Sequence, residues 1–469
     1  MSRPDAIVIG SGPNGLTAAI VLARAGRKVV VYEAQKTVGG AVRSAPLTLP
    51  GFTHDVCSAV HPFAVASPIF RSMPLAQFGL EWIAPPAELA HPFDDGTAAM
   101  VERSVSDTAA GLGPDAAAYR ALVGSVVDDW RRLEEVVFSP LTLIPRHPLS
   151  AARFGFNALR SCDAVVRRTF AGRDARALFA GIAAHGMLPL DVRPSAGVAL
   201  VLGALAHIVG WAIPRGGAQK LTDALVGYLR SLGGDVIVDT PVTNIDEVSA
   251  KTIICDLSPR PLLRIAGHRL PDAYRALIGK YRYGMGAFKV DWALDAPIPW
   301  RAESCARAAT VHLGGTYEAL IASERDAWDG RVCDRPFVIL VQPSLFDASR
   351  APAGKHTAWA YCHVPHGSTV DMTDRIEAQI EAVAPGFRDR VLARSTMSPA
   401  EIERHNANLV GGDIGAGVSD LRQLFARPTW RWHSTPVKGL YLCSASTPPG
   451  VGVHGMCGYW AAQRALADG

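Results

Sequence analysis

AIVIGSGPNGLTAAIVLARAGRKVVVYEA, residues 6–34, joins two β-rich runs through a glycine-rich turn and an apolar segment. The first run covers residues 6–9, and the turn after it holds three glycines within six positions. Apolar residues then recur at helical spacing from Leu16 to Ala25, and Val29 opens the second β-rich run. This order predicts a βαβ unit, in which a helix connects two parallel strands.

The turn fits the pattern G-x-G-x-x-G, and an acidic residue ends the second strand. Gly10 permits a tight turn, Gly12 lets the backbone approach a pyrophosphate, and Gly15 lets the helix pack on the strand. The helix N-terminus adds N–H donors and partial positive charge. Glu33 can accept hydrogen bonds from ribose hydroxyls and would repel a 2′-phosphate, so FAD or NAD is favoured over NADP. The cofactor-binding residues expected here are Gly10, Gly12, Pro13, Asn14, Gly15, Glu33 and Ala34.

A second glycine pair follows the second strand. Gly39 and Gly40 would again let the backbone meet phosphate, and Arg43 could pair with that phosphate. A solvated surface cation is the alternative interpretation of Arg43. Because NAD dehydrogenases do not need this element, it favours FAD.

The C-terminal loop, residues 448–455, repeats the glycine pattern in a different context. Only fourteen residues follow Gly455, so no second strand and no acid can complete another dinucleotide fold. The loop instead precedes a helix predicted from Met456 to Ala467, whose N-terminus would face the pyrimidine edge of a flavin. The residues assigned to this part of the cofactor site are Ser444, Gly452, Val453 and His454.

The composition indicates which partners and which cellular location to expect. The chain has 469 residues, 49% of them hydrophobic, and a net charge of only +4, without a basic run that would indicate nucleic acid as a partner. The eight cysteines form no C-x-x-C pair and no cluster at metal-ligand spacing, so we expect no metal and a reducing, cytoplasmic location. The uncharged residues 195–213 predict a buried helix, with membrane insertion as the alternative.

The motifs occur in the order that is typical of one family. The chain resembles the phytoene desaturase-like (carotenoid oxidoreductase) flavoproteins, kin of the amine oxidase superfamily, over almost its whole length. The segments that carry the resemblance are 8–16, 39–43, 55–62, 214–217, 283–291, 408–413 and 448–458. It implies a noncovalent FAD, with the backbone of Val242 near adenine. Arg43 departs from the usual spacing by one residue, which leaves its partner open.

The resemblance and the element pattern together predict an α/β protein. A Rossmann-type FAD-binding domain, made of residues 1–75, 214–265 and 410–469, would carry an inserted α+β substrate domain. Residues 76–213, mostly a helical block, and 266–409, with strands near 286–295, 336–342 and 356–364, would form that second domain as a sheet plus helices.

The function expected from the sequence is FAD-dependent dehydrogenation or oxidation of a mainly apolar, isoprenoid-like substrate by hydride transfer to flavin N5. The alternatives are a flavin amine oxidase, a redox-neutral flavin isomerase and a flavin-bound interaction protein without turnover. A small lipophilic substrate is the expected partner, together with an unidentified electron acceptor. Peripheral contact with a membrane stays open.

Two histidines are the candidates for catalysis. His454 lies in the glycine-rich loop, where an imidazolium could stabilise the reduced, anionic flavin. His61 follows the flavin loops closely and could line the pocket; the alternative is a hydrogen-bonded structural histidine before Pro62. Hydride transfer depends chiefly on positioning and water exclusion, so a catalytic side chain is optional.

Overall fold

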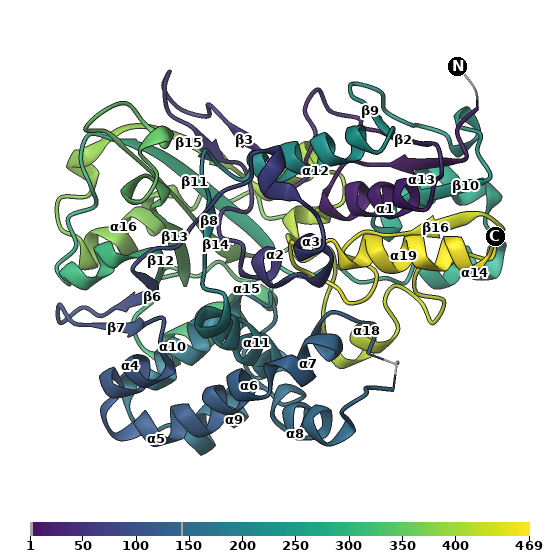
Figure 1. The fold of residues 1–469 in the computed structure, drawn as a ribbon. Helices are drawn as coiled ribbons and strands as arrows, with labels where there is room; N and C mark the ends of the chain where they lie inside the picture. The colour runs from purple at the N-terminus through teal and green to yellow at the C-terminus, as the bar shows by residue number, and fades with distance from the viewer. Residues whose placement is uncertain (1–2, 142–143) are drawn as a thin grey trace.

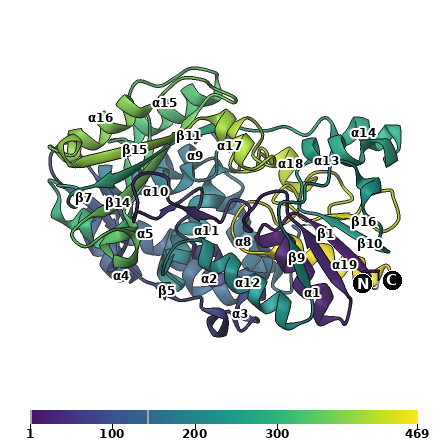
Figure 2. The ribbon, with the colours of Figure 1, turned by 90° about the horizontal axis from the view of Figure 1, so that it is seen from above.

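The structure is a computed structural model that describes residues 3–141 and 144–469. Two β-sheets lie at opposite ends of the molecule, and a block of helices lies along one side of both (Figure 1). Seen from above, the strands of the smaller sheet lie beside the two termini, and the larger sheet lies beyond the central helices (Figure 2). The α/β fold class predicted from the sequence is confirmed, including its Rossmann-type domain.

The smaller sheet is parallel throughout and draws its strands from three distant parts of the chain. Its order is β16-β10-β1-β2-β9, with these bounds: β1 (Ala6–Ile9), β2 (Val29–Tyr32), β9 (Asp235–Ile237), β10 (Thr252–Cys255) and β16 (Leu440–Leu442). Helices cover both faces, which is why the strands are apolar at nearly every position. One face packs against α1 (Pro13–Arg24), α12 (Gln219–Ser231) and α19 (Met456–Ala467), and the other against α13 (Pro259–Ala266) and α14 (Asp272–Ile278).

The larger sheet has seven strands in the order β15-β11-β14-β13-β12-β6-β7. Its strands are β6 (Ala87–Pro92), β7 (Ala98–Val101), β11 (Gly286–Leu294), β12 (Ala308–Leu313), β13 (Val338–Val341), β14 (His356–Val364) and β15 (Val391–Met397). Only the β6–β12 pair is parallel. Residues such as Phe288 and Val290 pack below α16 (Thr373–Val383), whereas the alternate residue Lys289 faces a central cavity. The strands predicted near 286, 336 and 356 are confirmed.

The helical block lies between the two sheets and to one side of them (Figure 1). Its helices are α4 (Val105–Gly111), α5 (Ala116–Tyr119), α6 (Ser125–Asp128), α7 (Trp130–Val137), α8 (Pro148–Ala158), α9 (Cys162–Thr169), α10 (Arg173–Ala184) and α11 (Ser195–Ile208). Residues 116–138 do not form one continuous α-helix, because Arg120–Gly124 forms a π turn and Asp129 leaves helical geometry. The segment 195–213 forms the largely buried α11 as far as Ile208, where the helix ends, and then leads into β8 (Ile213–Pro214). In the described ranges, no helix is long and apolar enough to cross a membrane.

Short elements connect these layers. They are β3 (Ser44–Ala45), β4 (His54–Asp55), α2 (Pro62–Ala66), α3 (Pro68–Arg71), β5 (Trp82–Ile83), β8 (Ile213–Pro214), α15 (Tyr317–Trp328), α17 (Pro399–His405) and α18 (Leu421–Phe425). Asp55 on β4 ties three distant segments together, because it accepts hydrogen bonds from Ser44 Oγ at 2.7 Å and Ala218 N at 2.7 Å and pairs with Arg350 at 2.8 Å.

Candidate active site

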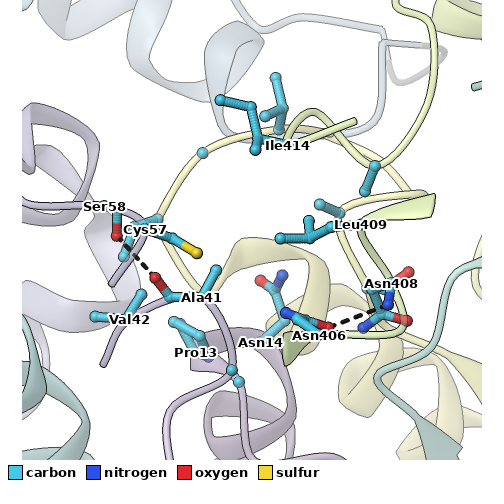
Figure 3. A pocket seen from close by; sticks show the side chains of 18 of the residues that line it. Pro13, Asn14, Ala41, Val42, Cys57, Ser58, Asn406, Asn408, Leu409 and Ile414 are labelled. Carbon is cyan, nitrogen blue, oxygen red and sulfur yellow. Dashed lines mark hydrogen bonds between the residues drawn. The ribbon is translucent and has the colours of Figure 1, made fainter. Parts of the chain in front are cut away.

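One cavity of about 1000 Å³ connects the end of the parallel sheet to the larger sheet and the helical block. The glycine-rich loop after β1, the loop before α19, the floor formed by β11 to β14 and the inner faces of α8 and α11 all contribute to its wall. In Figure 3, Ala41 and Cys57 lie across the opening from Leu409, and Pro13, Asn14 and Asn406 lie along its lower side. The site is therefore assembled from every major part of the chain.

The first glycine loop has no room for larger side chains. Gly10 has a φ of +101°, and a Cβ on Gly15 would lie 2.1 Å from the carbonyl oxygen of Gly10. A Cβ on Gly12 would lie 2.5 Å from Asp256 Oδ2. Gly10, Gly12, Pro13 and Asn14 line the cavity, while Gly15 packs behind them. This geometry gives a phosphate close access to the backbone at the start of α1.

Glu33 lies on the cavity wall at the end of β2 and is fixed by three hydrogen bonds. Its Oε2 accepts from Ser11 N at 2.9 Å and from Ser11 Oγ at 2.6 Å, and its Oε1 accepts from Gln35 N at 2.8 Å. Ala34 and Val242 also line this end of the cavity. An oriented carboxylate beside these residues suits a ribose with an adenine next to it.

The second glycine pair lies directly against the first loop. A Cβ on Gly40 would lie 3.1 Å from Gly12 Cα, and Gly39 N donates to Ser11 Oγ at 3.2 Å. Arg43 is only 5% exposed, so it is not the solvated cation of the alternative interpretation. Its Nε donates to Gly40 O at 2.8 Å and its Nη2 to His405 O at 3.2 Å. Burial lowers the pKa of Arg43, and the nearby Glu33 opposes that shift. Gly40 and Arg43 line the cavity, and Gly39 supports them from behind.

The C-terminal loop closes the site and joins the two ends of the chain. Ser444, Gly452, Val453 and His454 all line the cavity. Gly452 has a φ of +136°, a conformation that favours glycine. The following helix α19 packs directly on α1, because a Cβ on Gly458 would lie 1.9 Å from Asn14 O. The start of α19 therefore faces the same cavity as the start of α1.

His454 is buried between two aromatic rings and held by its own backbone. Its Nδ1 accepts a hydrogen bond from Met456 N at 3.0 Å, and its ring lies 6.0 Å from Phe63 and 5.9 Å from Phe138 between centroids. Burial lowers its pKa to about 4. The ring is therefore uncharged near neutral pH, which corrects the expectation of an imidazolium: desolvation outweighs any local stabilisation of the charge.

His61 also lines the cavity and is buried, with its ring 6.0 Å from that of Trp82. Burial lowers its pKa to about 4. Neither ring nitrogen has a hydrogen-bond partner among the described residues, so the structural alternative of a hydrogen-bonded histidine is not what the structure shows. The backbone N of His61 donates to Ala212 O at 2.9 Å, which links it to the end of the helical block.

The sequence did not reveal several polar residues of the cavity. Asp256, directly after β10, accepts a hydrogen bond from Gly15 N at 3.1 Å, and burial raises its pKa to about 7. Lys289 on β11 pairs with Asp291 and lies 5.0 Å from the ring of Trp359. Burial raises the pKa of Asp291 to about 6, and Lys289 opposes that rise. Lys289 and Asp291 alternate with apolar residues and lie in the segment 283–291 that carries the resemblance, but neither signal assigned them to the cavity.

The part of the cavity away from the glycine loops is apolar. The cavity-facing residues of α11 and the segment after it are Gly197, Val198, Val201, Leu202 and Trp211. These residues form an apolar wall of the cavity, whereas Ala204 and Leu205 on other faces of α11 pack into the hydrophobic cores. The physical reason is that only one stripe of a buried helix can face a cavity. Val201 is therefore a position on α11 where a larger side chain would enter the cavity.

Cys57 lines the cavity beside Val42 but is a weak nucleophile. Burial raises its pKa to about 11, so the thiol stays protonated near neutral pH. All eight cysteines are free of disulfides. A covalent flavin link through Cys57 is therefore disfavoured.

Comparisons with known proteins agree with this geometry. The family described as an NAD(P)-binding Rossmann-like domain matches residues 8–73. The pyridine nucleotide-disulfide oxidoreductase domain-containing protein 2 of Rattus norvegicus is 27% identical over 99% of this chain and 93% of its own length. One of the chains of limonene dehydrogenase from Castellaniella defragrans is 23% identical over 99% of this chain and 94% of its own length.

Solved structures with the same fold cover nearly the whole chain. An oxidoreductase from Methanosarcina mazei superposes with a TM-score of 0.69 at 16% identity, over 98% of this chain and 99% of that one. Putrescine oxidase bound to putrescine gives a TM-score of 0.64 at 16% identity, over 99% and 98%. The chain therefore has the fold of these oxidoreductases, and its relatives carry the names of oxidoreductases.

Proposed function

We propose that this chain is an FAD-dependent oxidoreductase that dehydrogenates or oxidises a mainly apolar substrate. The observation that carries the proposal is the single cavity that runs from Glu33 and the glycine loops to the apolar wall formed by α8 and α11. A dinucleotide and an apolar molecule could therefore meet in one continuous cavity. The full-length alignment with a limonene dehydrogenase chain supports an apolar substrate.

FAD fits the site better than NAD because the cavity continues past the first glycine loop. The polar wall continues beyond the ribose-binding end through Gly40, Arg43 and the C-terminal loop. The starts of α1 and α19 both face this part of the cavity. When bound, FAD would supply the hydride acceptor at its N5 atom. We also propose that residues 1–75, 214–265 and 410–469 form the FAD-binding domain. Residues 76–213 and 266–409 would form the substrate domain.

The residues of the chain would contribute binding, orientation and water exclusion. Glu33 is oriented by Ser11 to hold the ribose, and Val201 and Trp211 would hold the apolar body of the substrate. The uncharged ring of His454 is held in one orientation, because its Nδ1 accepts from Met456 N and the ring also hydrogen-bonds the backbone of Gly450. Excluding water protects a hydride transfer, so this apolar wall suits the chemistry.

Amine oxidation is the second candidate, because Trp359 and Tyr361 stack on the cavity floor with centroids 5.8 Å apart and an angle of 19° between the planes. The sequence alone did not pair these aromatic rings. The likeness to putrescine oxidase shows the fold and not the substrate. Lys289 argues against an amine substrate. Its ammonium group already lies over the ring of Trp359 and would repel a second ammonium group.

The test is anaerobic bleaching of the protein-bound flavin, followed by the mass of the product. We expect a yellow protein that releases FAD on denaturation and is bleached by lipophilic alkenes or terpenoids, but not by NADH or NADPH. Faster bleaching by polar amines would favour the amine oxidase. Substrate conversion without net bleaching would identify an isomerase, and no response to any ligand would favour a non-catalytic role.

A further inference from the structure

Exposed apolar side chains gather around α8. Of the thirteen large hydrophobic residues that are exposed in the described structure, five lie within residues 141–159. Their exposed fractions are 38% for Leu141, 93% for Ile144, 86% for Leu149, 57% for Phe156 and 41% for Leu159. Apolar residues scattered singly on a surface need no explanation, but such a concentration indicates a contact surface.

The cavity opens at this surface. Leu141 and Leu159 are both partly exposed and both line the cavity, so they lie at its mouth. Phe154 and Ala158 line the cavity from the inner face of α8, while Leu149 and Phe156 belong to its outer face. The helix lies at the lower edge of the molecule in Figure 1, remote from the parallel sheet. A molecule that docks on α8 therefore lies beside an entrance to the apolar part of the site.

The same surface is basic. Residues 144–162 include three arginines, Arg146, Arg153 and Arg160, and contain no Asp or Glu. Arg146 pairs with Glu135 of α7 at 3.7 Å, which leaves Arg153 and Arg160 to meet an anionic partner. The guanidinium of Arg160 lies 4.3 Å above the ring of Phe156, and that of Arg168 lies 5.7 Å from it. Guanidinium groups beside exposed Leu and Phe are typical of helices that lie in the interface of an anionic bilayer. Charge complementarity thus selects anionic lipid over a neutral apolar partner.

We propose that the α8 surface, defined as residues 144–160 with Leu141 at its rim, docks on an anionic phospholipid bilayer. Leu149 and Phe156 would insert among the acyl chains, and the arginines would meet the headgroup phosphates. The substrate would then pass between Leu141 and Leu159 without crossing water. Only this last step rests on the proposed function; the docking itself does not.

The test is sedimentation of the purified full chain with sucrose-loaded vesicles. One set contains phosphatidylcholine alone, and the other contains phosphatidylcholine with phosphatidylglycerol. We expect binding to the anionic set, weakening with added salt, and little binding to the neutral set. The double variant L149E/F156E should bind at least tenfold more weakly. The matched control L277E/L392E, at exposed leucines on α14 and β15, should bind like the unchanged protein.

A second arm separates docking from catalysis. Neither Leu149 nor Phe156 lines the cavity, so L149E/F156E should retain turnover of a detergent-solubilised substrate while losing turnover of the same substrate in vesicles. Equal sedimentation of both variants, or no vesicle binding at all, overturns the proposal even if the enzyme is active. Concentration-dependent dimers that L149E/F156E abolishes, without lipid binding, would assign the surface to a second copy of the chain instead.

Discussion

The carboxylate of Asp256 accepts a hydrogen bond from the backbone N–H of Gly15, 241 positions earlier in the chain, at 3.1 Å. This contact places a buried acid against the glycine loop that would receive a pyrophosphate. Burial raises the pKa of Asp256 to about 7, and the charge of Glu33 contributes to the rise, so the group titrates near neutral pH.

Asp256 makes FAD affinity depend on pH. Above pH 7 its ionised carboxylate would repel the pyrophosphate, so we expect the Kd for FAD to rise by about tenfold between pH 6 and 8, which is about 1.4 kcal/mol. In Asp256→Asn the dependence should vanish. Flavin fluorescence quenching on titration of the apoprotein measures both. A folded-state pKa above the unfolded value also means that stability falls as the pH rises from about 4 to about 7.

Glu33→Ala should weaken FAD by about 1.5–3 kcal/mol, the scale of hydrogen bonds to a charged group. The reason is that its carboxylate, oriented by Ser11 N and Oγ, would lose its bonds to the ribose. Flavin occupancy after gel filtration measures the effect, with the exposed Glu318→Ala as control. Unchanged occupancy, or FMN as the released flavin, would contradict the assignment of Glu33.

Val201→Arg should abolish turnover of an apolar substrate while FAD stays bound. Val201 lines the apolar wall on α11, and an arginine there would fill the cavity with an unpaired charge. Bound flavin is read from the visible spectrum, and turnover from product formation. Leu277→Arg, at an exposed position on α14, is the control. Normal turnover by Val201→Arg would show that the substrate does not use this part of the cavity.

Arg350→Met should destabilise the fold by about 3–5 kcal/mol, because it leaves the buried Asp55 without its partner. Burial alone would raise the pKa of Asp55, but Arg350 and the hydrogen bonds from Ala218 and Ser44 hold it below its usual value. The pair therefore stabilises the protein above about pH 4 and loses that effect as the pH falls. Urea unfolding at pH 7 measures the loss, and the surface variant Arg331→Met should change little.

The sequence by itself determined individual strands and helices, because the residue patterns that predict them lie within short stretches of the chain. The period of the apolar residues and the glycine positions predicted the βαβ unit of residues 6–34, and the strand over 356–364 and the helix from Met456 to Ala467 have the bounds that the sequence indicated.

Only the tertiary structure decided which residues share the cavity and in what state. Asp256 lies in no motif, and the segment 283–291 that carries the resemblance gives Lys289 no role. Both reach the site because β10 ends beside it and β11 passes beside it. Val201 lines the apolar wall and Leu205 does not, since the packing of α11 turns only one face of the helix toward the cavity. His454 is uncharged because the assembled fold removes it from water, and desolvation is a property of the packed molecule that no local pattern records.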